Sequence, residues 1–248
     1  MERITKVLMT KEGRRFFIRG DEDCHSQFGA VRKEDIAAAK DGTRLPTNTG
    51  KEMFLYSPFF RDLYSRIKRG AQIIPLKDIA AIVAETGIGK GSRVVDAGAG
   101  TGALACFLAH LAKEVVTYDI RDDFIAIVGE NIAFLQLDNI TVKNKDIYGG
   151  IDEEDVDTIT LDVPEPWKAL PHAAAALKAG GFLVSYSPSI TQTADFTNAV
   201  LDNPRFAHIK TFEIIEREWE IIGRKVRPET AAIGHSGFIT IARKLQVG

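Results

Sequence analysis

The sequence has few cysteines, no long apolar run and little net charge. Its two cysteines, Cys24 and Cys106, are too few for a disulfide scaffold and lack the spacing of metal ligands. No apolar run approaches the roughly 18 residues that a membrane-spanning helix needs, and the first 17 residues contain no apolar signal-peptide core. We therefore expect a soluble cytoplasmic protein with free thiols and no metal site.

The overall composition is that of a folded protein. With 248 residues, of which 45% are hydrophobic and 27% charged, the chain is neither disordered nor fibrous and has room for one or two domains. The net charge of −2 is unevenly spread: residues 1–75 carry 15 Lys and Arg against 10 Asp and Glu, whereas residues 76–248 carry 17 against 24. The basic first third favours an anionic partner for that part, although chance also accounts for such an imbalance.

The pattern of the chain changes near residue 70. Residues 1–70 contain short apolar runs at 6–10 and 14–20, which predict a hairpin in a small β-rich domain. Residues 71–248 alternate strands and helices, which predicts a doubly wound α/β domain with a mostly parallel sheet. We expect strands at 93–98, 114–119, 139–146, 156–162, 182–188, 209–222 and 237–244, and helices at 79–86, 102–112, 122–137, 166–181 and 190–203.

Three boundaries of the α/β domain carry specific expectations. Asp78 is expected to cap the helix at 79–86, and Gly87 to end it. The pair Gly180-Gly181 is expected to end the helix at 166–181. No helix separates the last two strands, which predicts an antiparallel pair that closes the sheet.

A glycine-rich loop follows the first strand of the α/β domain. Gly98, Gly100 and Gly102 stand between the apolar strand and the next helix. Glycines let the backbone turn sharply and approach a ligand, and the start of the helix offers unpaired N–H groups. Because ligands of open α/β sheets bind beyond the carboxyl ends of the strands, the loop predicts a nucleotide-like ligand. The alternative is a tight turn that binds nothing.

The spacing of these glycines favours one class of cofactor. The dinucleotide fingerprint G-x-G-x-x-G would place its third glycine at Ala103, although some dinucleotide sites accept alanine there. Asp96 lies two residues before the loop, where it has no use in binding a pyrophosphate but suits a cationic ligand. S-adenosylmethionine carries a sulfonium and an ammonium group and no phosphate, and it fits both observations.

Two further acids follow the next two strands. Asp119, at the end of the strand at 114–119, is placed to accept hydrogen bonds from ribose hydroxyls, as in dinucleotide enzymes. Asp146, after the third strand, is placed to accept hydrogen bonds from the amino group of an adenine. Each acid alone is also explained as a solvated residue at a strand end. The glycine loop, Asp119 and Asp146 follow three successive strands, and together they support the prediction more strongly than each does alone.

A stiff acidic loop follows the fourth strand. Asp162 ends the strand, and Pro164, Pro166 and Trp167 follow within five residues. Prolines fix φ, and a carboxylate beside an aromatic ring suits a flat base, whose amino group donates to the acid while a ring packs on its face. If the base is adenine, Asp162 would orient it and raise the electron density at N1, and methyl transfer would then depend mainly on alignment. The alternative is that Asp162 is only a turn residue at the end of the strand.

Taken together, these residues resemble the tRNA (adenine-N1) methyltransferase family in its archaeal form, which modifies T-loop adenines. The glycine loop alone would indicate only a class I methyltransferase, but the segments at 161–167 and 227–239 make the resemblance specific. The matching segments are 69–78, 96–104, 118–124, 145–151, 161–167, 177–188 and 227–239.

The resemblance implies a fold, an activity and partners. The fold would be a Rossmann-like sheet of seven strands with a small N-terminal β domain. The activity would be S-adenosylmethionine-dependent methylation of N1 of adenine in tRNA, at position 58 or at both 57 and 58. The N-terminal domain would help bind tRNA, and the protein would form a homotetramer, a dimer of dimers.

The resemblance also implies roles for the cofactor-binding residues. Asp119 would bind the ribose, Asp146 the adenine of the cofactor, and Phe124 would lie near that adenine. Asp162 would line the cofactor site and, as the catalytic residue, hold the target adenine. The residues that would cradle the methionine part are Gly98, Ala99, Gly100, Thr101, Gly102 and Ala103.

On the substrate side, the resemblance implies three residues and meets one departure. Trp167 would lie beside the target base, whereas Arg227 and His235 would lie near the substrate or a subunit contact, with a solvated or core role equally open. The family usually reads I-I-Y-P-K-D before its first helix, but here Pro75 takes the place of the aromatic residue expected near the active site. Trp167, Tyr56 and Tyr64 are candidates to compensate.

Three other functions fit parts of the pattern. A methyltransferase acting on a protein or a small molecule would keep the fold, but the basic first third and the loop with Asp162 and Trp167 argue against it. A nicotinamide-dependent oxidoreductase is disfavoured by the glycine spacing. A non-catalytic RNA-binding subunit is disfavoured because the glycine loop and Asp162 are intact.

Overall fold

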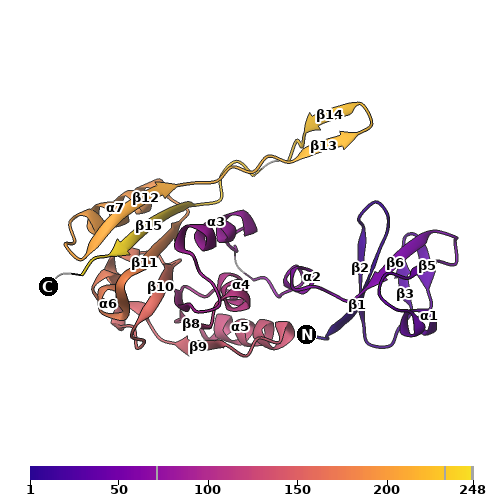
Figure 1. Cartoon of the computed structure of the whole chain (residues 1–248), viewed down its shortest axis with the longest axis horizontal. Helices are drawn as coiled ribbons and strands as arrows, with labels where there is room; N and C mark the ends of the chain where they lie inside the picture. The colour runs from indigo at the N-terminus through magenta and orange to yellow at the C-terminus, as the bar shows by residue number, and fades with distance from the viewer. Residues whose placement is uncertain (71, 232, 247–248) are drawn as a thin grey trace. The chain divides into compact units, whose positions relative to one another are not determined.

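The computed structural model describes residues 1–70, 72–231 and 233–246, and the chain forms two compact units (Figure 1). The first unit comprises Met1–Ile67 with Ala133–Gln136. The second comprises Lys68–Ile132 with Leu137–Gly248.

The first unit is built on an antiparallel sheet of four strands in the order β2-β1-β6-β5. The hairpin expected within residues 6–20 is confirmed, since β1 (Ile4–Met9) pairs with β2 (Arg15–Arg19). Apolar side chains from the sheet, from the β3–β4 hairpin and from α1 form its core. The other elements are β3 (Cys24–Ser26), β4 (Gly29–Val31), α1 (Lys33–Ala38), β5 (Arg44–Pro46), β6 (Glu52–Tyr56) and α2 (Phe60–Tyr64).

The second unit contains a seven-stranded sheet in the order β12-β15-β11-β10-β7-β8-β9. The five strands from β9 to β11 are parallel, and β15 runs antiparallel to both of its neighbours, which confirms the expected parallel sheet with an antiparallel closing pair. The strands are β7 (Arg93–Ala97), β8 (Glu114–Asp119), β9 (Ile140–Asn144), β10 (Val156–Leu161), β11 (Leu177–Ser187), β12 (Phe206–Phe212) and β15 (Phe238–Lys244).

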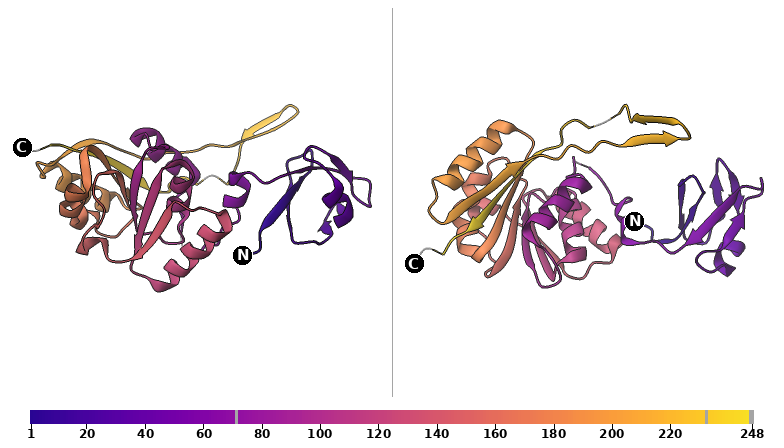
Figure 2. Two further views of the ribbon diagram at one scale, coloured as in Figure 1. Left: turned by 60° about the horizontal axis from the view of Figure 1, so that its bottom comes forward. Right: turned by 45° about the horizontal axis from the view of Figure 1, so that its top comes forward.

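Helices cover both faces of this sheet (Figure 2). On one face lie α3 (Leu76–Thr86), α4 (Ala103–Leu111) and α5 (Asp122–Leu135), and on the other lie α6 (Leu170–Ala176) and α7 (Ile190–Leu201). Helix α4 is almost wholly buried, as its apolar sequence predicted. Because the chain moves from β7 outward to β9 and then returns to β10, the order of strands reverses between β7 and β10, where ligands of such sheets bind.

The prediction that Asp78 caps helix 79–86 is wrong, although its end at Gly87 is confirmed. The helix starts earlier, at Leu76, and Pro75 occupies the capping position with φ −62° and ψ 153°. Asp78 therefore lies in the first helical turn, where it is fully buried and paired with Lys77. The fixed φ of a proline suits a helix start, and tertiary contacts claim the carboxylate.

Two predicted element boundaries were also wrong. The helix predicted for 166–181 is a short 3-10 turn η2 (Pro166–Ala169) followed by α6, and Gly180 and Gly181 lie inside strand β11. The single strand predicted for 209–222 ends at Phe212, and residues 219–222 instead form β13 (Trp219–Ile222), which pairs with β14 (Lys225–Pro228). Pairing with a neighbouring strand decided both outcomes, and local sequence alone does not contain it.

Two expectations from composition can be set beside the structure. Among the described residues, no helix is long and apolar enough to cross a membrane. Cys24 and Cys106 are both buried free thiols, and they belong to different units.

The core beneath α7 provides a test of the fold. Phe196 is fully buried with the strands of the sheet, and phenylalanine-to-alanine changes in cores cost about 3–5 kcal/mol. We expect Phe196→Ala to lower the melting temperature clearly in differential scanning calorimetry. Ile190→Ala, on the same helix at a side chain that is 60% exposed, is the matched control and should change stability by less than about 0.5 kcal/mol. Equal effects of the two changes would contradict this packing.

Candidate active site

The carboxyl ends of four parallel strands meet at one cavity. Because β7, β8, β9 and β10 run parallel, the residues that follow them lie at the same edge of the sheet. A cavity of about 370 Å³ at this edge is lined by residues from all four strand ends. The structure thus brings together six of the predicted residues there, namely Gly98, Gly100, Asp119, Phe124, Asp146 and Asp162.

The glycine loop is shaped by close backbone approach. Gly98 has φ +84°, and a Cβ atom placed on it would lie 1.9 Å from the backbone oxygen of Asp162. Gly102 caps α4 with φ +76°, and a Cβ atom there would lie 2.9 Å from the side chain of Val128. Real Cβ atoms do not approach other atoms so closely, so any larger residue at Gly98 would push the loop away from Asp162.

A second, smaller cavity of about 30 Å³ lies between the glycine loop and Asp162. Asp96 lines it and is almost completely buried, with its carboxylate accepting hydrogen bonds from Thr117 (2.6 Å) and Thr160 (2.7 Å). The hydroxyl oxygen of Thr101 is buried and lacks a hydrogen-bond partner among the described residues. The loop residues that line this cavity are Gly98, Ala99, Gly100, Thr101 and Ala103, whereas Gly102 does not.

Asp119 and Asp146 present carboxylates to the larger cavity. Asp119 accepts hydrogen bonds from the backbone N–H groups of Gly100 (Oδ2, 2.9 Å) and Arg121 (Oδ1, 2.9 Å), which fix both of its oxygens. Asp146 caps the 3-10 turn η1 (Ile147–Gly149) by accepting from the N–H of Tyr148. Each carboxylate oxygen has more than one lone pair, so both acids retain capacity to accept from a ligand.

Phe124 forms an apolar wall of the same cavity. The guanidinium group of Arg121 lies over its ring, 3.9 Å from the ring centroid. This cation–π contact holds the ring in place at the mouth of the cavity.

Asp162 lies where three cavities adjoin. It lines the larger cavity, the small cavity beside the glycine loop and an open groove of about 510 Å³. Burial, together with the nearby charge of Asp96, raises the pKa of Asp162 from 3.8 to about 7. Since no hydrogen bond to its side chain occurs within the described residues, the carboxyl group is free to accept or donate one to a ligand.

The groove beyond Asp162 has flat apolar walls. Trp167, Pro164 and Pro188 line it, together with the polar side chains of Thr191, Gln192 and Asp195. The predicted neighbours Asp162 and Trp167 therefore share one groove. An aromatic ring and proline rings near a carboxylate suit a heterocyclic base that donates from an amino group.

Two side chains that the sequence did not single out hold the loop after β10. The amide of Gln192, on α7, donates to the backbone oxygens of Val163 (3.0 Å) and Pro164 (2.5 Å). The hydroxyl of Tyr148 accepts from the N–H of Glu165 (2.9 Å), and Tyr148 also lines the larger cavity. The loop is thus fixed from both sides.

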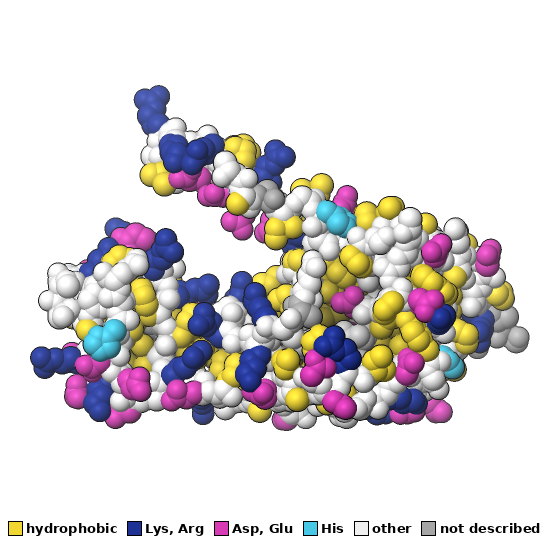
Figure 3. All heavy atoms as spheres, turned by 180° about the vertical axis from the view of Figure 1, so that it is seen from behind, with side chains coloured by type: hydrophobic (Ala, Val, Ile, Leu, Met, Phe, Trp, Pro, Cys, Tyr) yellow, Lys and Arg dark blue, Asp and Glu magenta, His cyan; other side chains and the backbone are white. Residues whose placement is uncertain are grey.

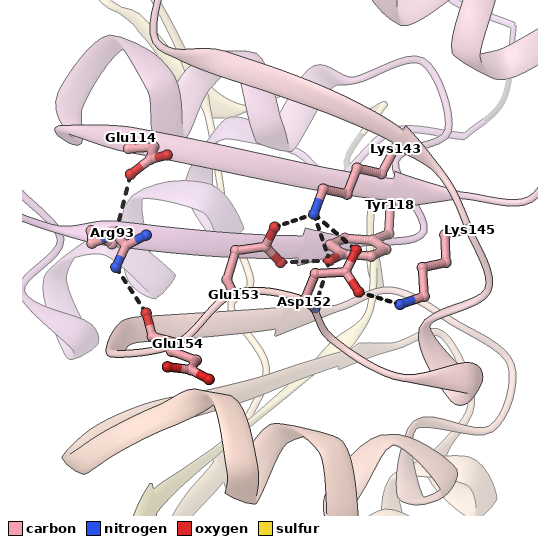
Figure 4. A network of polar contacts seen from close by, with 8 residues as sticks. All are labelled: Arg93, Glu114, Tyr118, Lys143, Lys145, Asp152, Glu153 and Glu154. Atoms are coloured by element: carbon pink, nitrogen blue, oxygen red, sulfur yellow. Dashed lines mark hydrogen bonds and ion pairs between the residues drawn. The ribbon is translucent and has the colours of Figure 1, made fainter.

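A polar network behind the larger cavity was also missed (Figure 4). Tyr118, which lines the cavity, donates its hydroxyl to Glu153 at 2.5 Å, and Lys143 bridges Glu153 (2.5 Å) and Asp152 (3.0 Å). Lys145, another lining residue, pairs with Asp152 at 2.5 Å. The network ties the loop before β10 to β8 and β9. Tyr118 lies 25 or more residues before the other members, which all fall within residues 143–153.

The three remaining predictions concern Arg227, His235 and Pro75. Arg227 lies on β14 and pairs with Glu220 at 2.7 Å, and it lines none of the three cavities around Asp162. His235 contacts the groove only indirectly, through its ring nitrogen and the backbone oxygen of Pro188 (3.1 Å). Pro75 lines a separate cavity with Lys77.

The raised pKa of Asp162 generates a test with a definite sign. Because the folded pKa is about 7 and the unfolded value about 4, the stability that the protonated form provides is complete below about pH 4 and is lost as the pH rises to 7. We expect Asp162→Asn to melt a few degrees above the wild type at pH 8.5, since 1 kcal/mol shifts Tm by roughly 2–4 °C at this size. The difference should shrink at pH 5. Asp195→Asn, an exposed acid of the same groove, is the control and should behave alike at both pH values.

Comparisons with known proteins agree with this geometry. The family described as tRNA methyltransferase complex GCD14 subunit matches residues 63–237. The tRNA (adenine(57)-N(1)/adenine(58)-N(1))-methyltransferase TrmI of Methanocaldococcus jannaschii is 35% identical, covering 96% of this chain and 94% of its own. The tRNA (adenine(58)-N(1))-methyltransferase TrmI of Thermus thermophilus is 32% identical, covering 96% of each chain.

Solved structures show the same fold. An S-adenosylmethionine-dependent O-methyltransferase of Thermotoga maritima has a TM-score of 0.88 and 26% identity, covering 100% of this chain and 95% of its own. The tRNA (m1A58) methyltransferase TrmI of Aquifex aeolicus has a TM-score of 0.84 and 22% identity, covering 99% and 98%. The predicted class I fold is confirmed, and S-adenosylmethionine is the cofactor. The chain belongs to the GCD14 family of tRNA methyltransferases.

Proposed function

We propose that this chain transfers a methyl group from S-adenosylmethionine to N1 of an adenine in tRNA, at position 58 or at both 57 and 58. The relatives that cover nearly the whole chain carry this activity in their names. The observation that carries the proposal is the carboxyl group of Asp162, which stands between the cofactor cavity and the groove with Trp167. The alternative, a protein or small molecule as acceptor, is not favoured.

The larger cavity fits the cofactor. Asp119 would accept hydrogen bonds from the ribose hydroxyls and Asp146 from the adenine amino group, with Phe124 against the adenine ring. The methionine part would lie along Gly98–Ala103. Gly98 packs against the backbone of Asp162 on one side and lines the small cavity, where a ligand fits, on the other. Bound there, the cofactor supplies an electrophilic methyl group on a sulfonium.

The groove fits the acceptor base. Trp167 and Pro164 would pack on the faces of the adenine, and the Asp162 carboxylate would accept a hydrogen bond from its N6 amino group. This contact fixes the ring so that the N1 lone pair points toward the cofactor cavity, and alignment lowers the barrier of an in-line displacement. The carboxylate also stabilises the positive charge that develops on the adenine as N1 is alkylated, and it is the nearest group to take the proton.

Two substitutions separate the roles of the two carboxylates. Asp162→Asn should bind S-adenosylmethionine within a few-fold of the wild type in calorimetry but lose about 10²-fold or more of its tRNA methylation rate, because it loses a charge at the reacting base. Asp119→Ala should weaken cofactor binding by roughly 10- to 100-fold, the cost of one or two hydrogen bonds to a charged group. Mass spectrometry of the nucleosides measures the m1A formed. Full activity of Asp162→Asn would refute its role.

The first unit is proposed to help bind tRNA. This unit carries 13 Lys and Arg against 10 Asp and Glu, whereas the rest of the chain carries 19 against 24. Release of counterions from RNA phosphates would then make binding weaken steeply with salt. Since tRNA is the substrate, we propose that the protein acts in the cytoplasm.

The hairpin of β13 and β14 is proposed as a contact between subunits of a homotetramer. Opposed residues share one face of a hairpin, so Trp219, Ile221, Val226 and Pro228 form an apolar face. Three of them are exposed by 54%, 70% and 57%, respectively for Trp219, Ile221 and Val226. An isolated two-stranded hairpin is marginally stable in water, and this one requires a cover.

The charges on the hairpin favour a second copy as that cover. Figure 3 shows Lys and Arg side chains at its tip, where Arg224 and Lys225 lie, and uncovered apolar side chains along it. The base of the hairpin is acidic, because Glu216, Glu218 and Glu229 line one cavity there. Two hairpins related by a two-fold axis would place each basic tip against the acidic base of the other.

Neighbouring residues on opposite faces of β13 test the subunit contact. Ile221→Glu introduces a charge on the apolar face, and we expect its molar mass in light scattering to fall below that of the wild type. Ile222→Glu changes a residue of similar exposure (65%) on the other face and should leave the assembly intact. A single-chain mass for the wild type, or no response to Ile221→Glu, would disprove this interface.

A further inference from the structure

The segment that carries the hairpin leaves and re-enters the α/β unit through a narrow neck, formed by residues 213–214 and 235–236. Glu213 pairs with His235 at 2.8 Å across this neck. One residue further on, the Lys77 ammonium group donates to the backbone oxygen of Ile214 (2.8 Å) and to the hydroxyl of Ser236 (2.6 Å). The two segments of the neck are therefore joined twice, by the Glu213–His235 pair and by Lys77.

All three N–H donors of the Lys77 ammonium group have partners at this neck. Its third contact is the carboxylate of Asp78, at 2.7 Å, and an ammonium group has three N–H donors. Asp78 is completely buried and accepts in addition from Ser236 (2.7 Å) and from the Tyr186 hydroxyl (3.1 Å). The Lys77 side chain is only 11% exposed. The pair is thus a fully satisfied buried cluster.

The neck contacts the end of β11 at one point and the wall of the base groove at a second. The ring of Tyr186, at the end of β11, lies against Gly237, where a Cβ atom would come within 2.4 Å of the ring. Burial is the main cause that raises the pKa of the Tyr186 hydroxyl, and the charges of Asp78 and Asp162 add to it. The second point is Pro188, which lines the groove and accepts from the His235 ring.

The His235 ring holds the neck to Pro188 in one protonation state. Its Nδ1 faces the Glu213 carboxylate and its Nε2 faces the Pro188 carbonyl oxygen. Both partners only accept hydrogen bonds, so the ring donates to both as imidazolium.

We propose that Lys77 is a positioning residue for methylation of the base: by holding both segments of the neck on Asp78, it fixes His235 and, through it, the groove residue Pro188. The proposal rests on the proposed function. It also connects the hairpin with the groove, because the neck segments that carry the hairpin contact Pro188 through His235.

A purely stabilising role would be an alternative reading of the same contacts. Replacing both members of a buried ion pair by uncharged residues often leaves stability unchanged, whereas removing one member leaves the other charge buried without a partner. The double change Lys77→Met with Asp78→Asn therefore removes the ties to Ile214 and Ser236 without leaving a buried charge. Lys77→Arg restores a cation, and Lys90→Met alters an exposed lysine on the loop after α3 as the matched control.

The experiment measures single-turnover methylation of tRNA, cofactor affinity and melting temperature for each variant of the full chain. We expect the double variant to be folded at the assay temperature, to bind S-adenosylmethionine within about two-fold of the wild type, and to methylate about 10- to 100-fold more slowly. Lys77→Arg should recover part of the rate, and Lys90→Met should match the wild type.

Two results would overturn the positioning role. One is a folded double variant with a wild-type rate, and the other is a slow variant whose cofactor affinity falls in parallel. If the double variant is unfolded, His235→Leu applies the same criteria at the other cross-link of the neck. Absence of m1A with the wild-type protein would instead refute the proposed function and is recognised separately.

Discussion

The site depends on the approach of two backbone segments to within contact distance. The loop after β7 passes against the end of β10 because residue 98 has no side chain, and the oxygen of Asp162 occupies the space that a Cβ atom would need. On either side of a few main-chain atoms, this contact places the loop that we propose for the methionine part and the carboxylate that we propose for the base. Parallel strands provide the common edge, and the glycine allows the last ångströms of approach.

The same closeness sets the electrostatics. Asp96 and Asp162 lie at the ends of the neighbouring strands β7 and β10, and burial together with the charge of Asp96 opposes the ionisation of Asp162. Asp96 is supported by two threonine hydroxyls, whereas Asp162 has no such support among the described side chains. A cationic ligand between them would relieve the repulsion, so the two carboxylates are electrostatically complementary to a sulfonium and a developing adeninium.

The sequence predicted the parts of this site that follow from local pattern. Glycines after an apolar strand, acids at successive strand ends and prolines after Asp162 converge because parallel strands finish at one edge. The errors occurred where distant pairing decided the outcome. Asp78 has the residue type of a cap but accepts hydrogen bonds from Tyr186 and Ser236, and the predicted helix 166–181 ends early because Leu177 and then residues 182–185 pair with β10. Tyr148 and Gln192 hold the catalytic loop through backbone atoms, which leave no pattern in the sequence.

Tyr148 links the two halves of the site in a way that bears on redesign. Its ring is a wall of the cofactor cavity, while its hydroxyl supports the Glu165 N–H in the loop that carries the base. Trimming this aromatic side chain would widen the cavity. Here that trimming would release the loop on which acceptor recognition relies. The ring of Phe124, on which Arg121 packs, lines the same cavity and makes no ring or hydrogen-bond contact with the acceptor loop among the described residues. Widening the cavity at Phe124 would therefore leave the supports of that loop in place.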